Sequence, residues 1–545
     1  MMTSNKQIDV RRALVLSGAF SFLCSGARFC LLPFLTLCLR RWGLSPVLTG
    51  CVLGTKHLVT LLWSPAAALL SQHYDRRRTV ICGSLVCSAA AALVLLLIPS
   101  VGVHTQNYSC NTSDPGAGPT LNVTNGTAPT AEDVGEQNAE SDDTTMTPSN
   151  ISEAVTSNIS SVDGSEGTKV AQKSDVHSGF LAQLQTLDPR YQLFFLVLMA
   201  VLVWELVSAP LDWTVDDGLY EYLDFAEAAD RHGGARLWAL LGAACGAGSA
   251  GLLVSLLSCL LAHGAHRSAV HFYTYGAVTV LALPVATYLP LYLNQKRNRA
   301  AGLLKAVRLV CGSPRALLCG ATTLLAGAAG SAVDDFLLWQ MQDHGSSELH
   351  MGLGLSAALL TQASFPLLAG LASKLLSPAR VLVLGAAGLA LQCFYYSLLW
   401  GPWAALPGQL LGGVGAGAFW WAVSVQSEEV AAPGAERSVG RVYAGLCLPL
   451  GRSLGSFAGG LLAQRLGLPW LFRGAALVLM LWCLVLPLLQ CQAPHQRRIN
   501  YSRLLAADAS EASDSESEQD GDGSDMSDDR SNKNRSGRKP KQWID

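Results

Sequence analysis

Long apolar runs alternate with short polar segments along most of the chain. A run of about 20 predominantly apolar residues is long enough to cross a bilayer as a helix. Twelve such runs occur, near 13–39, 45–70, 79–102, 191–214, 237–262, 268–292, 316–340, 351–376, 380–400, 403–426, 441–464 and 469–491. Glycine and proline recur inside them, which transmembrane helices tolerate better than soluble helices do. The pattern predicts an all-α membrane protein with twelve transmembrane helices.

The longest internal connection with a basic run, 293–315, divides these spans into two sets of six. Spans five and eleven open alike, because Arg236 and Arg441 are each followed two residues later by an aromatic side chain. Duplicated halves around a central cavity are typical of transporters. We therefore expect two pseudo-symmetric six-helix bundles, 13–292 and 316–491, after a short N-terminal segment, 1–12.

Two polar blocks stand apart from this apolar core, at 104–190 and 492–545. The whole chain is 50% hydrophobic and 14% charged, whereas a soluble domain has about 25% charged residues. The first block carries six N-glycosylation triplets, at Asn107, Asn111, Asn122, Asn125, Asn150 and Asn158. Glycan acceptors belong outside the cytosol, and Lys and Arg are concentrated in the alternate connections. We expect both termini to be cytosolic. We expect the protein to reside in the plasma membrane or an endosomal membrane.

The block 492–545 is rich in serine and acidic residues, as disordered segments are. Ser513, Ser515 and Ser517 lie among acidic residues and are candidate phosphorylation sites. A tail that only solvates the protein is the alternative interpretation of the same composition.

Several short motifs resemble the major facilitator superfamily. The turn Asp75-Arg76-Arg77-Arg78 after span two is similar to the loop signature of that superfamily, without its glycines, as in the lactose-permease-like branch. Pro33-Phe34, the stretch 42–46, the stretch 234–242 and the insertion after span three resemble its domain-containing protein 6 group. The resemblance implies alternating access between two bundles, with the first span of each triplet lining the cavity. It names no substrate.

Charged side chains inside predicted spans indicate a site, because burying one costs at least about 2.5–3.5 kcal/mol. The candidates for a substrate or proton cavity are Arg28, Glu205, Asp334, Asp335 and Gln409. The candidates for an inter-bundle ion pair or gate are Arg452, Asp75, Arg76, Arg236 and Arg441. The alternatives are a fixed ion pair, such as Arg28 with Glu205 or Asp335, and a basic turn that only sets topology.

These features favour a secondary or facilitative transporter of a small polar solute, with proton coupling through Glu205 or an aspartate of span seven as one option. A transporter-fold receptor that binds a protein partner through 104–190 is the alternative. No phosphate-binding loop, zinc spacing or paired nucleophile and base is present, so we expect no enzyme activity, cofactor or metal. No basic face favours nucleic acid, and membrane lipid is the expected surrounding.

Overall fold

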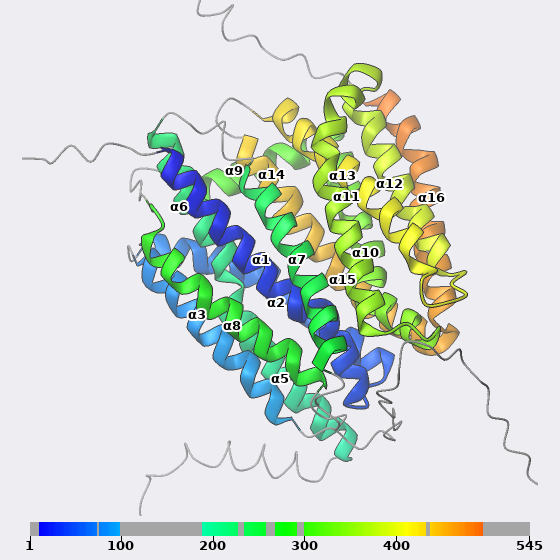
Figure 1. Cartoon of the computed structure of the whole chain (residues 1–545). Helices are drawn as coiled ribbons and strands as arrows, with labels where there is room; N and C mark the ends of the chain where they lie inside the picture. The colour runs from blue at the N-terminus through cyan, green and yellow to red at the C-terminus, as the bar shows by residue number, and fades with distance from the viewer. Residues whose placement is uncertain are drawn as a thin grey trace, which may run out of the picture.

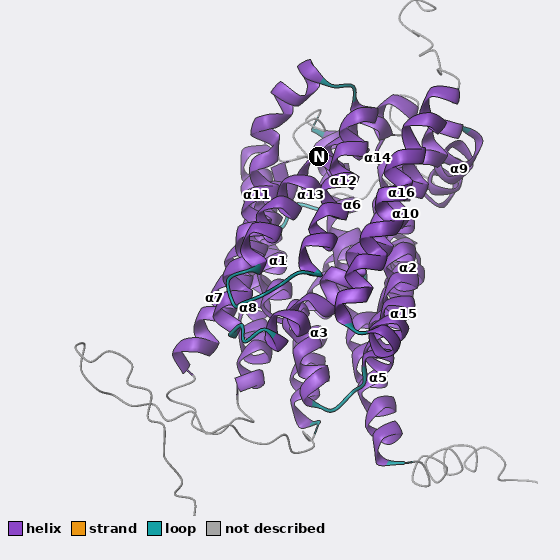
Figure 2. Ribbon diagram, turned by 90° about the vertical axis from the view of Figure 1, so that its right-hand side faces the viewer, coloured by secondary structure: helices purple, strands orange, loops and turns teal. Residues whose placement is uncertain are grey.

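The computed structural model describes residues 10–73, 76–98, 188–226, 234–257, 267–291, 299–431 and 436–493. The predicted glycosylation triplets, the phosphorylation candidates Ser513, Ser515 and Ser517, and Asp75 lie outside these residues. All secondary structure in the described part is helical (Figure 2).

The N-terminal bundle contains α1 (Val10–Arg41), α2 (Pro46–His73), α3 (Arg77–Val94) with the 3₁₀ turn η1 (Leu95–Leu97), α5 (Pro189–Ser208), α6 (Pro210–Phe225), α7 (Gly234–Leu257) and α8 (Arg267–Tyr288). The helices α5 and α6 follow each other directly and together form one long span, 189–225. This bundle therefore supplies six membrane crossings.

The C-terminal bundle contains α10 (Pro314–Asp343), α11 (Glu348–Leu375), α12 (Pro378–Tyr396), α13 (Ala405–Val430), α14 (Glu436–Arg441), the π-helical turn η4 (Val442–Cys447), α15 (Leu448–Leu466) and α16 (Leu468–Gln492). One crossing is formed by α14, η4 and α15 in sequence. A further helix, α9 (Arg299–Gly312), lies in the connection between the bundles, where the sequence analysis predicted none.

The two bundles lie side by side, and the colours in Figure 1 separate them along the chain. The contacts between them are made mainly by α2 with α15 and by α7 with α11. We call the end where α1 finishes and α11 begins the outer end, and the end with α6, α9 and α14 the inner end, after the orientation expected from the basic residues. The predicted all-α fold of two six-helix bundles is confirmed.

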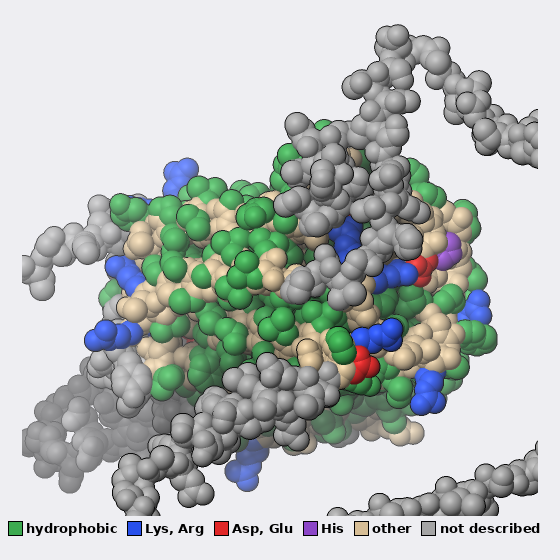
Figure 3. All heavy atoms as spheres, turned by 90° about the horizontal axis from the view of Figure 1, so that it is seen from below, with side chains coloured by type: hydrophobic (Ala, Val, Ile, Leu, Met, Phe, Trp, Pro, Cys, Tyr) green, Lys and Arg blue, Asp and Glu red, His purple; other side chains and the backbone are tan. Residues whose placement is uncertain are grey.

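The outside of the molecule is strongly apolar, as a bilayer requires. Leu367 and Leu97 are among many large hydrophobic side chains that are exposed in the isolated protein. Figure 3 views the outer end of the molecule, where Lys, Arg, Asp and Glu side chains stand among hydrophobic ones. Within the described residues, eleven helical segments are long and apolar enough to span a membrane. The remaining span, α13, is 26 residues long and contains Gln409 and several glycines, which lower its hydropathy.

Candidate functional site

A central cavity of about 340 Å³ opens between helices of the C-terminal bundle and is faced by Phe29 of α1 and Leu240 of α7. Most of its wall is apolar. The polar side chains that line it are Asp334, Gln362, Gln392, Gln409 and Arg452. The cavity therefore brings together Asp334 and Gln409, which the sequence analysis predicted as site residues, from α10 and α13.

Asp334 and Arg452 form an ion pair within this cavity. Arg452 Nη2 lies 3.1 Å from Asp334 Oδ2, and the two side chains remain 38% and 51% exposed. The helices α10 and α15 both belong to the C-terminal bundle, so the pair is internal to that bundle. Arg452 therefore pairs with the aspartate that faces it on α10 and not across the two bundles as predicted, while its role in a gate stays a prediction.

The neighbouring Asp335 points away from the cavity. Consecutive residues of a helix project about a quarter-turn apart, so Asp334 and Asp335 cannot share one surface. Asp335 is 3% exposed and accepts a hydrogen bond of 2.6 Å from Ser456 Oγ of α15. It is a buried carboxyl group at the α10–α15 contact.

Glu205 lies in a comparable setting in the N-terminal bundle. Its side chain is 7% exposed, and Thr60 Oγ1 of α2 donates to Glu205 Oε1 at 2.5 Å. Its carboxyl group faces α2 and lines neither of the two cavities described here. Glu205 and Asp335 are thus two buried carboxyl groups held by hydroxyls, with no ion pair in the described part of the chain.

Arg28 contacts a break in the long span formed by α5 and α6. Pro210 has no N–H to donate to the carbonyl of Leu206, and Trp63 Nε1 donates to that oxygen instead at 2.7 Å. Arg28 donates to the carbonyl of Ser208 at 3.2 Å and forms an ion pair with Asp212. The structure therefore pairs Arg28 with Asp212, and not with Glu205 or Asp335 as the sequence analysis proposed as its alternative.

Further side chains complete the hydrogen bonding of this break. Ser84 Oγ donates to the carbonyl of Val207 at 2.7 Å, and Ser64 Oγ donates to that of Ala209 at 3.0 Å. Backbone groups inside a membrane need such partners. The sequence analysis missed the break, although a proline inside a long apolar run was the signal for it.

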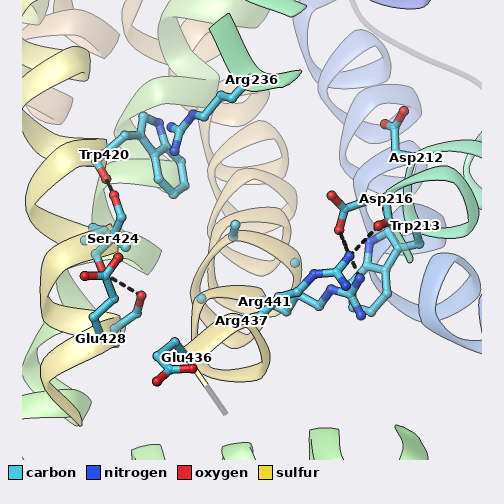
Figure 4. A pocket seen from close by; sticks show the side chains of 15 residues that line it. Asp212, Trp213, Asp216, Arg236, Trp420, Ser424, Glu428, Glu436, Arg437 and Arg441 are labelled. Atoms are coloured by element: carbon cyan, nitrogen blue, oxygen red, sulfur yellow. Dashed lines mark hydrogen bonds and ion pairs between the residues drawn. The ribbon is translucent and has the colours of Figure 1, made fainter. Parts of the chain in front are cut away.

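A second cavity of about 480 Å³, which we call the inner vestibule, lies between the bundles at the inner end. Figure 4 shows Arg437 and Arg441 reaching from the C-terminal bundle to Asp216 of α6. Both arginines also pair with Asp217, whose side chain is buried. Arg441 is thus a residue of an inter-bundle ion-pair network, whereas Arg437, Asp216 and Asp217 were absent from the predicted gate.

Trp420 separates the vestibule from the central cavity and lines both. The guanidinium of Arg236 lies over its indole ring, 5.1 Å from the ring centroid (Figure 4). Arg236 belongs to α7 and Trp420 to α13, so this cation–π contact bridges the bundles. Arg236 therefore makes an inter-bundle contact through an aromatic ring, not through a carboxylate.

The outer end is closed by charged groups that the sequence analysis missed. Arg40 Nη2 of α1 lies 2.6 Å from Asp343 Oδ1 of α10, and Arg41 pairs with Glu348 of α11. His271 Nε2 of α8 lies 3.5 Å from the same Glu348. These residues lie at the ends of spans. A charged side chain there is close to water and costs little free energy, so its position in the sequence did not mark it as a site residue.

Close backbone contacts reinforce this closure. A β-carbon on Gly460 of α15 would lie 2.6 Å from the carbonyl oxygen of Pro46 of α2, and one on Gly352 would lie 2.7 Å from that of Ala247. Only glycine permits such an approach. The two bundles are therefore in direct backbone contact on both sides of the outer end.

The basic turn after α2 is only partly described. Arg76 is exposed at the start of α3. Arg77, which follows, is buried and lies 2.7 Å from Glu221 of α6 within the N-terminal bundle. Among the described residues, no group of three or more His, Cys, Asp or Glu side chains is placed to hold a metal ion.

Comparisons with known proteins agree with this architecture. A protein of Danio rerio named major facilitator superfamily domain-containing protein 6-like is 43% identical over 97% of this chain and 98% of its own length. The protein of that name from Mus musculus is 36% identical over 95% of this chain and 97% of its own length.

Solved structures of transporters share the fold at low sequence identity. The nucleoside transporter NupG superposes with a TM-score of 0.58 at 11% identity, covering 88% of this chain and 98% of NupG. A D-xylose-proton symporter gives a TM-score of 0.55 at 10% identity, covering 87% of this chain and 97% of its own. The model of the MFS_1 like family matches residues 14–474. The chain is therefore a multi-pass membrane protein that belongs to the MFS_1 like family of the major facilitator superfamily.

Proposed function

We propose that this membrane transporter carries a small polar solute by alternating access, and that the central cavity is its binding site. The observation that carries the proposal is the arrangement of closures along one path. The outer end is held shut by ion pairs and by glycine contacts between the bundles. On the inner side, the cavity adjoins the vestibule at Trp420. With the outer end closed, a solute would enter or leave on the inner side once the ion pairs of the vestibule separate.

The inner vestibule supplies the second gate of such a cycle. Its ion pairs join α6 to α14 and so tie the bundles together. Charged pairs that form in one arrangement of two rigid bodies and separate in the other bias an equilibrium between two states. Arg437 and Arg441 would separate from Asp216 and Asp217 when the inner end opens fully.

Proton coupling is part of the proposal, through the two buried carboxyl groups. Glu205 and Asp335 are held by Thr60 and Ser456, which can hydrogen-bond to either the charged or the neutral carboxyl group. Buried carboxyl groups of transporters commonly serve proton relays. Thr60 belongs to α2 and Ser456 to α15, and these two helices form one of the main contacts between the bundles, so protonation would act on the bundles through that contact.

The test is uptake of solutes from a complex mixture. Purified protein is reconstituted into liposomes, incubated with a small-molecule extract, and the contents are identified by mass spectrometry. We expect at least one solute to be enriched over protein-free liposomes, and the enrichment to be lost in Arg452→Ala. Gly474→Ala is the matched control, because no atom of the described residues lies within 4 Å of a β-carbon at that position.

Absence of any enrichment from folded, reconstituted protein would contradict transport. Binding of a soluble protein partner that depends on residues 104–190 would then favour the receptor hypothesis.

A further inference from the structure

The charges that line the central cavity cancel each other. Among the residues that form its wall, Asp334 and Arg452 are the charged ones, and they are paired with each other. A solute with a net charge would therefore bring a charge without a counter-charge into a mainly apolar space, which is strongly unfavourable. The cavity is matched to a solute of no net charge.

Two donors in the wall lack partners. Gln409 is 3% exposed, and its buried amide nitrogen Nε2 has no hydrogen bond to any residue that the structure describes. The same holds for Arg452 Nε. Nearly all buried polar groups in proteins are hydrogen-bonded, so each exception needs an explanation. Both nitrogen atoms are buried as the side chains stand, so acceptor groups on a bound solute would satisfy them after Gln409 and Arg452 turn toward the cavity.

The remaining polar groups also suit hydroxyl groups. The half-exposed carboxylate of Asp334 accepts hydrogen bonds, and the amide of Gln362 both donates and accepts. A hydroxyl is the neutral group that can serve both kinds of partner. The amide of Gln392 is already directed to a protein group, since its Nε2 donates to the hydroxyl of Tyr396 at 2.9 Å.

The size and the apolar walls restrict the solute further. The volume of about 340 Å³ equals the space of about eleven water molecules at about 30 Å³ each. Phe29 and Trp420 line the cavity and offer flat apolar surfaces. A single sugar ring, with or without a small attached ring, matches this volume and this mixture of surfaces.

We infer that the central cavity binds an uncharged, hydroxyl-bearing solute built on one sugar ring, and that Gln409 and Arg452 hold its oxygen atoms. The inference deepens the proposed function and rests on it. Gln409 determines affinity through its unpartnered donor. The Asp334–Arg452 pair remains intact on binding and selects against charged analogues.

The experiment compares sugars that share a ring and differ in charge. Purified full-length protein is melted in the presence of D-glucose, D-glucosamine, D-glucuronate or uridine, with uridine 5′-monophosphate as the charged partner of uridine. A ligand that binds only the folded state raises the melting temperature in proportion to its saturation. We expect glucose or uridine to raise it at millimolar concentration, and their charged analogues to require at least tenfold more.

Substitution then locates the site. We expect Gln409→Ala to raise the half-saturating concentration at least fivefold. Gln192→Ala is the control, since Gln192 lies at the outer end of α5, away from the cavity. Equal or larger shifts with a charged analogue, no shift with either uncharged probe, or a shift unchanged in Gln409→Ala would overturn the inference.

The uptake measurement separates this failure from failure of transport. Enrichment of a charged solute in the liposomes would refute the sugar-ring inference and leave the transporter proposal standing. Binding of glucose or uridine without enrichment of any solute would retain the cavity assignment and refute transport.

Discussion

In the proposed alternating-access cycle, the glycine contacts at the outer end predict how one added methyl group should shift the balance between the two states. In Gly460→Ala the new β-carbon would lie 2.6 Å from the carbonyl oxygen of Pro46 and 3.0 Å from the Cα of Gly50. Both are backbone atoms of α2 and cannot swing aside as a flexible side chain could. The substitution therefore penalises the state in which the outer end is closed.

The size of the shift follows from the cost of overpacking. Inserting a methyl group into a close-packed contact costs about 1–3 kcal/mol. An arrangement in which α2 and α15 have moved apart carries no such cost. A difference of about 1–3 kcal/mol changes the ratio of two states by about 5- to 150-fold. Gly460→Ala should therefore raise the population with an open outer end by that factor.

The assay uses a native cysteine in the central cavity. Cys393 lines the cavity and is buried. A small membrane-impermeant thiol reagent is added to intact cells, and labelling of the peptide that contains Cys393 is followed by mass spectrometry. We expect labelling to accelerate by about 5- to 150-fold in Gly460→Ala, in line with the shift in population.

Two controls separate this effect from simple destabilisation. Gly474→Ala adds a methyl group where no atom of the described part of the chain lies within 4 Å, and it should leave labelling unchanged. Cys319, which is buried inside the C-terminal bundle, should remain unlabelled in every variant. Unchanged labelling of Cys393 in folded Gly460→Ala, or parallel labelling of Cys319, would refute the reasoning.

Three further predictions concern the charged groups. A double-mutant cycle of Arg441→Ala and Asp217→Asn, read from the melting of the protein, should give a coupling energy of about 0.5–3 kcal/mol, because the two side chains form an ion pair. Additive effects of the two substitutions would contradict this prediction. Arg77→Ala should destabilise the folded protein by about 3–5 kcal/mol, since it leaves Glu221 buried without this arginine. Adding Glu221→Gln to the same chain should recover part of the loss. A change in melting temperature no larger than that of a surface substitution would count against a structural role of the pair. Glu205→Gln should reduce uptake driven by a pH gradient at least tenfold, while exchange of solute at equal pH persists. An equal loss of driven uptake and of exchange would argue against proton coupling.

The helices could be predicted from the sequence because a bilayer requires long apolar runs. Pattern alone recovered even α13, whose glycines and Gln409 lower its hydropathy. The division into two bundles followed from the position of one basic connection. The helix α9 inside that connection was missed, because it is short and does not carry a membrane-spanning run.

The candidate site was harder to predict from the sequence, since it depends on the rotation of each helix about its axis and on contacts between distant segments. Periodicity shows that Asp334 and Asp335 face different directions, but only packing against α15 decides which one faces the cavity. For the same reason, the sequence did not identify Asp334 as the partner of Arg452. Arg28, which was predicted for the cavity, is absent from the walls of the two cavities described here and pairs with Asp212, a partner that neither the prediction nor its alternative named.

The most direct test of alternating access is a pair of distance measurements by pulsed electron resonance. Spin-labelled unnatural amino acids at Tyr191 and Trp400, which are exposed at the outer end of different bundles, report on that end. Labels at Phe225 and Leu375 report on the inner end in the same way. The account predicts two populations whose proportions change with solute and pH, with the outer distance long whenever the inner distance is short. A single population at both ends, or distances that lengthen and shorten together, would contradict alternating access.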